Sequence, residues 1–137
     1  MGRKSERELE VALRSLVGNW QDCSLLAASV FARHPVVVVM AESRYPGLGM
    51  LSRGLVLRDL IRDCLEDLVR ALHGDVRLRM MVEGALHGQT QRQIARTLNV
   101  SEEWVSRRYK PVLVGILLDA LQSRLRDVRN ASANNAA

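Results

Sequence analysis

The sequence predicts an all-α fold, and three observations lead to this expectation. Aromatic residues make up only 4% of the chain, so its core must be built from Leu, Val, Ile, Ala and Met, which suit helical packing. Apolar residues recur at spacings of three and four in segment after segment, which is the helical period. With 9 Gly and 3 Pro among 137 residues, turn-forming residues are slightly sparser than usual. A chain of this length predicts one domain, or one small domain with a helical appendage, and not a multidomain enzyme.

The N-terminal segment predicts two helices and a boundary between residues 34 and 35. A capping-box pattern at Ser5–Glu8 opens a periodic apolar segment, which predicts a helix over about 6–20. A second helix is expected from about 25 to His34, where the Pro35 that follows disfavours the helical conformation. The four valines at 36–39 are either a strand, which would need a second copy of the chain to pair with, or a helix beginning at Pro35.

The middle of the chain predicts a linker followed by two helices. The cluster at 45–49 is typical of a turn, and its glycines match neither a dinucleotide fingerprint nor a phosphate-binding loop. A long amphipathic helix is expected from 51 to 72, ending at His73-Gly74 with the glycine just past its end. Asp75 is placed to cap the next helix, which ends at Ala85–Gly88 in the same tetrapeptide, Ala-Leu-His-Gly.

Residues 90–109 predict two short helices joined by a sharp corner. Thr90–Gln93 again has capping-box form, and the helix that follows presents small and branched apolar residues on one face. Asn99 tolerates the left-handed conformation that a corner between helices requires, and Ser101 can cap the second helix. The little core expected between the helices contains Ile94, Ala95, Leu98, Val100 and Val105. This spacing predicts a helix-turn-helix.

The stretches 88–96, 98–101 and 105–108 resemble the helix-turn-helix shared by sigma factor region 4 and LuxR-type regulators, and the resemblance covers residues 75–120. It implies that the second helix lies in the major groove of DNA, with Glu103, Trp104, Ser106, Arg107 and Lys110 facing the duplex. The chain has Asn99 where the family usually has Gly, and Trp104 where it commonly has Thr.

The helical period places most of these residues on one outer face of the second helix, in agreement with what the resemblance implies. With Val105 and Tyr109 turned inward, residues 103, 106, 107 and 110 are expected on the outer face, where Arg107 can reach guanine and Lys110 or Arg96 a phosphate. The full set of candidate DNA-binding residues is Arg92, Arg96, Ser101, Glu103, Trp104, Ser106, Arg107, Arg108 and Lys110.

The C-terminal segment predicts a further, long helix. Pro111 can start it, and it carries a broad apolar face. That face either folds back on the helix of residues 57–72 or meets its twofold copy, and we expect a homodimer because such motifs often read palindromic sites. The resulting organisation is a helical region 1–73 for dimerisation or signal input, a three- or four-helix DNA-binding domain 75–129, and a disordered tail 130–137.

The charge pattern favours a nucleic-acid partner. The chain carries a formal net charge of +5, and residues 90–137 hold eight basic residues against four acidic ones, while the preceding segments are nearly neutral. We therefore expect a transcriptional regulator that binds double-stranded DNA. The alternative is an assembly or adaptor protein whose helix-turn-helix docks on protein, such as RNA polymerase or a phage packaging machine.

Other classes of function find little support in the sequence. No nucleophile elbow or metal-binding spacing is present, so we expect no catalysis, no cofactor and no metal site. Cys23 and Cys64 stand alone and are expected to be structural thiols. Neither a signal peptide nor an apolar run long enough to cross a membrane is found, which predicts a cytoplasmic protein without a membrane partner.

Overall fold

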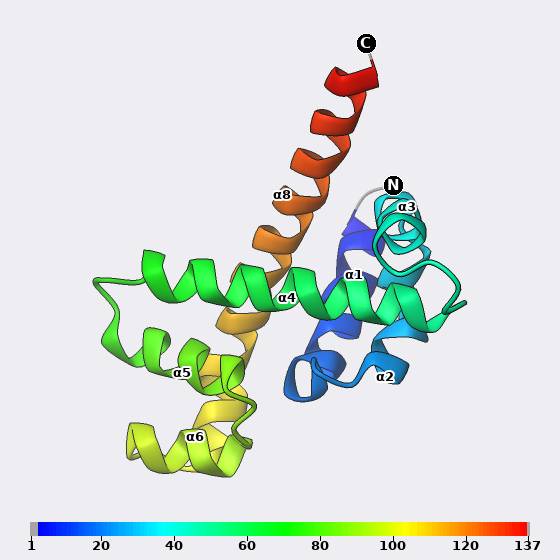
Figure 1. The fold of residues 1–137 in the computed structure, drawn as a ribbon. Coiled ribbons are helices and arrows are strands. Elements are labelled where there is room, and N and C mark those ends of the chain that lie inside the picture. The colour runs from blue at the N-terminus through cyan, green and yellow to red at the C-terminus, as the bar shows by residue number, and fades with distance from the viewer. Residues whose placement is uncertain (1–2, 137) are drawn as a thin grey trace.

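The computed structural model describes residues 3–136 of the backbone and the side chains of residues 6–131. Within this part of the chain every regular element is a helix, which confirms the all-α prediction (Figure 1). In chain order the elements are α1 (Arg3–Leu16), η1 (Val17–Asn19), α2 (Cys23–Ala27), η2 (Val30–Arg33), α3 (Pro35–Arg44), α4 (Leu51–Ala71), α5 (Val76–Leu86), α6 (Gln91–Leu98), α7 (Glu102–Trp104), η3 (Val105–Tyr109) and α8 (Lys110–Ala136).

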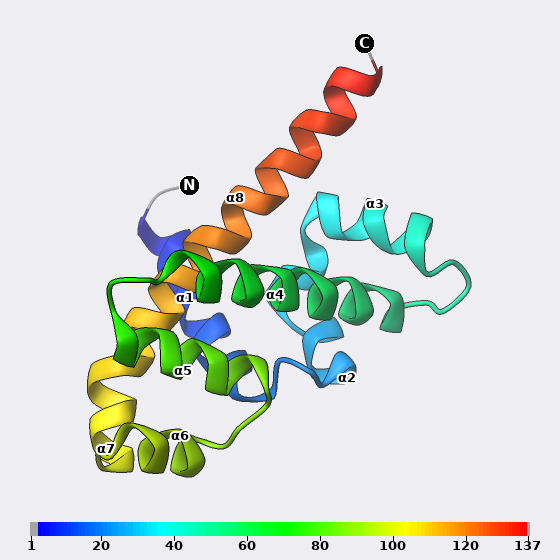
Figure 2. The ribbon, with the colours of Figure 1, turned by 60° about the vertical axis from the view of Figure 1, so that its left-hand side comes forward.

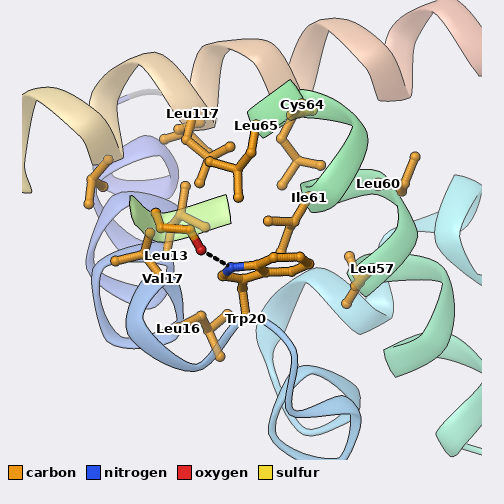
Figure 3. Close-up of a cluster of buried hydrophobic side chains, with 14 of the residues drawn as sticks. Leu13, Leu16, Val17, Trp20, Leu57, Leu60, Ile61, Cys64, Leu65 and Leu117 are labelled. Atoms are coloured by element: carbon orange, nitrogen blue, oxygen red, sulfur yellow. Dashed lines mark hydrogen bonds between the residues drawn. The ribbon is translucent and has the colours of Figure 1, made fainter. Parts of the chain in front are cut away.

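Helix α4 lies at the centre of the molecule. It contacts α2 and α3 at its N-terminal end and α5 at its C-terminal end, and α8 crosses it (Figures 1 and 2). Helix α1 packs along α8, so that the N-terminal and C-terminal segments of the chain meet. Figure 3 shows how the side chains around α4 interdigitate. One continuous cluster of buried side chains contains residues from 1–73 and from 75–129 alike.

The four valines at 36–39 belong to a helix, the second of the two structures that their sequence allowed. His34 is extended, with ψ 131°, and Pro35 is the first residue of α3. The Nδ1 atom of His34 accepts a hydrogen bond of 3.1 Å from the backbone N–H of Val36, which caps the helix. The boundary at 34/35 is therefore confirmed, and the proline acts as a helix start.

The two N-terminal helices differ from the prediction. Helix α1 begins at Arg3, so that Ser5 lies inside the helix and the capping box expected at Ser5–Glu8 does not start it; the helix ends at Leu16 and continues as the 3₁₀ turn η1 to Asn19. The segment expected to form one helix up to His34 is divided into α2 and η2, because the hydroxyl of Ser29 donates a hydrogen bond of 2.7 Å to the carbonyl of Leu26. Serine commonly competes for backbone groups in this way and interrupts helices.

The repeated tetrapeptide at the ends of α4 and α5 adopts two different conformations. Gly88 has φ +69°, the left-handed conformation typical of a residue past a helix end. Gly74 does not take this conformation, and Leu72 instead ends α4 by donating its N–H to the carbonyl of Leu68. The expected glycine cap at residue 74 is wrong, because the short connection 72–75 brings Asp75 directly to the N-cap of α5.

Pro111 does not begin a separate helix. The helical conformation continues from Glu102 through Ala136, because η3 is a π-helical turn in which the N–H of Lys110 donates to the carbonyl of Val105. The widened turn accommodates a proline, which has no N–H to donate to the regular ladder.

The apolar face of α8 folds back on α1 and α4, one of the two outcomes that the sequence left open. The backbone of α8 also extends into the segment 130–136, where a disordered tail was expected.

Candidate nucleic-acid interface

The corner between α6 and α7 has the conformation that the sequence predicts. Thr90 and Gln93 form a reciprocal capping box, with hydrogen bonds of 3.1 and 2.8 Å. Asn99 is left-handed, with φ 57° and ψ 45°, and is the only residue other than glycine with positive φ in the described chain. The Oγ atom of Ser101 accepts a hydrogen bond of 3.0 Å from the N–H of Trp104, which caps the second helix. These contacts fix the start and the angle of the second helix.

The helix-turn-helix has its own small core, which is continuous with the rest of the protein. Ile94, Ala95, Leu98 and Val105 are buried, as predicted, and Val100 packs against them. Helix α5 approaches this core closely at Gly84, where a Cβ would lie 2.7 Å from Cγ1 of Ile94. A glycine inside a helix is costly unless close packing requires it, so Gly84 is a structural requirement that sequence analysis missed.

Two polar contacts that the sequence did not predict hold the second helix in place. The side-chain amide of Gln91 donates a hydrogen bond of 3.0 Å to the carbonyl of Glu102, linking the first turns of α6 and α7. The guanidinium of Arg77 donates one of 3.4 Å to the hydroxyl of Tyr109, linking α5 to η3. That hydrogen bond lowers the pKa of Tyr109. The partners lie 11 and 32 residues apart, and no local pattern marks such distant pairs.

The exposed face of the second helix is turned relative to the expectation. Glu103 and Arg107 are exposed, as predicted, but Ser106 and Lys110 are half-buried. Arg108 joins the exposed face instead, and Lys110 lines a crevice beside Val17. Ser106 and Lys110 are thus less exposed than a regular α-helix would make them, because the π-helical turn η3 changes the angular register of the residues within and beyond it.

The exposed face of the second helix is organised by two internal pairs. Arg107 forms an ion pair of 2.9 Å with Glu103, one turn earlier, and both side chains are mostly exposed. The guanidinium of Arg108 lies over the ring of Trp104, 5.6 Å from its centroid, in a cation–π contact. Each pair is worth at most about 1 kcal/mol at an exposed site, so both arginines can be released at small cost to contact a partner.

Helix α6 contributes the remaining basic side chains of this surface. Arg92 and Arg96 are exposed and one turn apart on α6, and Ser101 is exposed at the corner. Figure 2 shows α6 and α7 next to one another at the end of the molecule away from the C-terminus. The structure thus gathers the predicted residues at one end of the molecule, where Lys110 lines the neighbouring crevice.

Comparison of the chain with models of protein families, with curated proteins and with solved structures finds no match in any of the three. In the part of the chain that the structure describes, no helix is long and apolar enough to cross a membrane. No three His, Cys, Asp or Glu side chains among the described residues gather in a way that would hold a metal ion.

Proposed function

We propose that this protein binds double-stranded DNA through its helix-turn-helix and acts as a transcriptional regulator. The observation that carries the proposal is the corner at Asn99, after which the second helix bears the exposed side chains of Arg107 and Arg108 beside the exposed arginines of α6. Such a corner places a second helix at a fixed angle to the first, which is the arrangement that inserts a helix into the major groove.

The residues take different roles in this proposal. Arg107 leaves its ion pair with Glu103 and donates to the edge of a guanine, since a guanidinium matches the two acceptors of that base. Arg92, Arg96 and Arg108 neutralise phosphates on either side of the groove, which fixes the position of the helix without reading sequence. Glu103 repels phosphate and can accept a hydrogen bond from the amino group of a cytosine. It therefore favours a cytosine in the DNA strand opposite the guanine that Arg107 contacts.

A homodimer is part of the proposal, but its interface is not the apolar face of α8. That face is covered by α1 and α4 of the same chain, where Leu117 and Leu121 are fully buried. Any twofold contact therefore uses another surface. DNA binding by one copy does not depend on the dimer, because all the candidate contacts come from a single helix-turn-helix.

A second candidate function is docking on another protein, for example RNA polymerase. The observation that favours it is an exposed apolar pair on the second helix and the start of α8: Trp104 and Val112 are each 46% exposed. Tryptophan is enriched at the centres of protein interfaces and is uncommon on free surfaces. The same face would then bind mainly by burial of apolar area.

Salt dependence distinguishes the two functions. We would measure the affinity of the purified protein for a random duplex and for the DNA upstream of its own gene across a range of salt concentrations, with the mass determined by light scattering in the same buffers. A DNA-binding regulator that contacts several phosphates loses orders of magnitude in affinity as salt rises from low to moderate concentration. A protein that does not bind either duplex at low salt contradicts the proposal and supports protein docking.

A further inference from the structure

A cavity lies far from the helix-turn-helix, where α1, η2 and the second half of α8 meet. It has a volume of about 510 Å³, within the range of about 300–1,000 Å³ typical of small-molecule sites. Its apolar wall is formed by Leu9 of α1, Val30 and Phe31 of η2, and Leu125 of α8. Three separate elements of the chain therefore build one hollow.

The polar part of this cavity is dominated by positive charge. Arg33 comes from η2, and Arg126 and Arg129 lie one turn apart on α8. All three side chains are exposed, and none of them forms an ion pair with a described side chain. Glu6 is the one acidic residue in the described lining. Guanidinium groups in this arrangement offer several donors to an anion, and their planar shape matches carboxylate and phosphate groups.

His34 adds a further donor to the lining. Its Nδ1 accepts the N–H of Val36, so the proton of the neutral ring lies on Nε2. Burial and, to a smaller extent, the nearby Arg129 lower the pKa of this histidine, which favours the neutral ring. The lining thus combines an apolar wall with three arginines, an imidazole and the amide of Gln122, against the single carboxylate of Glu6.

We propose that this cavity binds a small organic anion with an apolar body, such as a medium-chain carboxylate. The apolar wall of Leu9, Phe31 and Leu125 accommodates the body, and Arg126 and Arg129 bind the carboxylate. An inorganic anion would leave the apolar wall uncovered, and a neutral lipid would leave the guanidinium groups without a partner, so both bind more weakly. This site is independent of DNA binding, and the N-terminal helices and α8 build it together.

Calorimetric titration of the full chain with three probes tests the chemical class. We expect octanoate to bind, with 1-octanol and inorganic phosphate each binding at least about tenfold more weakly, because each satisfies only one half of the site. Binding of 1-octanol as tight as that of octanoate would contradict an anion site. Absence of octanoate binding would overturn the proposal altogether.

Variants locate the site. The double substitution Arg126→Gln and Arg129→Gln should weaken octanoate binding at least about tenfold, because it removes two charge-assisted hydrogen bonds at exposed positions that do not hold the fold. Arg14→Gln, which changes an exposed arginine of α1 outside the cavity, is the matched control and should leave the affinity unchanged. Octanoate should also shift the methyl NMR signals of Leu9 and Val30. Equal affinity of the double variant and the control, or unshifted methyl signals, would show that octanoate does not occupy this cavity.

Discussion

The indole Nε1 of Trp20 donates a hydrogen bond of 2.7 Å to the backbone carbonyl of Ala85, 65 residues away (Figure 3). Trp20 follows η1 and is 4% exposed, and Ala85 lies in the last turn of α5, directly before the helix-turn-helix. The contact therefore joins the N-terminal region to the element that supports α6. Around it, Leu57 and Ile61 of α4 complete a single packed cluster. The helix-turn-helix thus packs against the N-terminal helices through α5.

Replacing Trp20 by Phe should lower the free energy of unfolding by about 1–3 kcal/mol, because the substitution removes a buried hydrogen bond and leaves space in the core. The midpoint of urea unfolding, followed by circular dichroism, measures this loss. Trp104→Phe is the matched control, since Trp104 is 46% exposed, and it should change the stability by less than about 0.5 kcal/mol. Equal losses in the two variants would refute the role assigned to Trp20.

Asn99→Ala should destabilise the protein by about 1–2 kcal/mol, because alanine does not tolerate the left-handed conformation found here. Asn99→Gly should restore the stability to that of the original protein or above it, since glycine adopts this conformation without strain. Thermal unfolding of both variants checks the prediction. An alanine variant as stable as the glycine variant would show that residue 99 is not left-handed in solution.

The contact between α8 and α4 should weaken at acidic pH. Arg70 and Arg124 both donate to Asp67, and together they lower the pKa of its carboxyl group. A carboxylate whose pKa is lower in the folded state stabilises the fold above its unfolded value of about 4, and this contribution is lost as pH falls through the folded pKa. Because Asp67 is half exposed, solvent screening limits the contribution to about 1 kcal/mol or less.

Arg124→Gln tests this dependence. Its urea midpoint should lie below that of the original protein at pH 7, and the difference should shrink as the pH is lowered below the usual carboxyl value of about 4 and Asp67 becomes protonated. A difference that does not change with pH would mean that Arg124 contributes by packing alone.

Cys64 should resist thiol reagents in the folded protein. It is 1% exposed, and burial raises the pKa of its thiol to about 11, so that almost no thiolate exists near neutral pH. A Cys23→Ser variant leaves Cys64 as the single thiol. In this variant the colour reaction with Ellman's reagent at pH 8 should develop only after denaturant is added. Prompt reaction in native buffer would contradict the burial of Cys64 against α8.

The elements that the sequence predicted correctly are those set by local chemistry. The capping box at Thr90, the left-handed Asn99 and the cap at Ser101 are formed from residues within a few positions of one another, and all three are present. The division of residues 23–33 into two short helices was missed, because the tertiary packing and the Ser29 hydrogen bond outweigh the apolar periodicity.

The differences from the expectation at the candidate interface have a single physical source. Pro111 was expected to end one helix and begin another, and the positions of Ser106 and Lys110 were assigned on a regular helical register. The π-helical turn at 105–109 joins the two helices and changes that register. A π-helical turn has no sequence signature of the kind that caps and turns possess, so the partial burial of Lys110 was not predictable from spacing.

The most direct test of DNA binding through this face is the affinity of the double variant Arg107→Ala, Arg108→Ala for duplex DNA, measured across salt beside the Arg14→Ala control. Both arginines are exposed, so the variant should fold as the original protein does, which circular dichroism verifies. We predict at least a tenfold loss of affinity, about the effect of one lost base contact, and a shallower dependence on salt than that of the control. An affinity and a salt dependence equal to those of the control would contradict the account and leave the helix-turn-helix as a protein-docking surface.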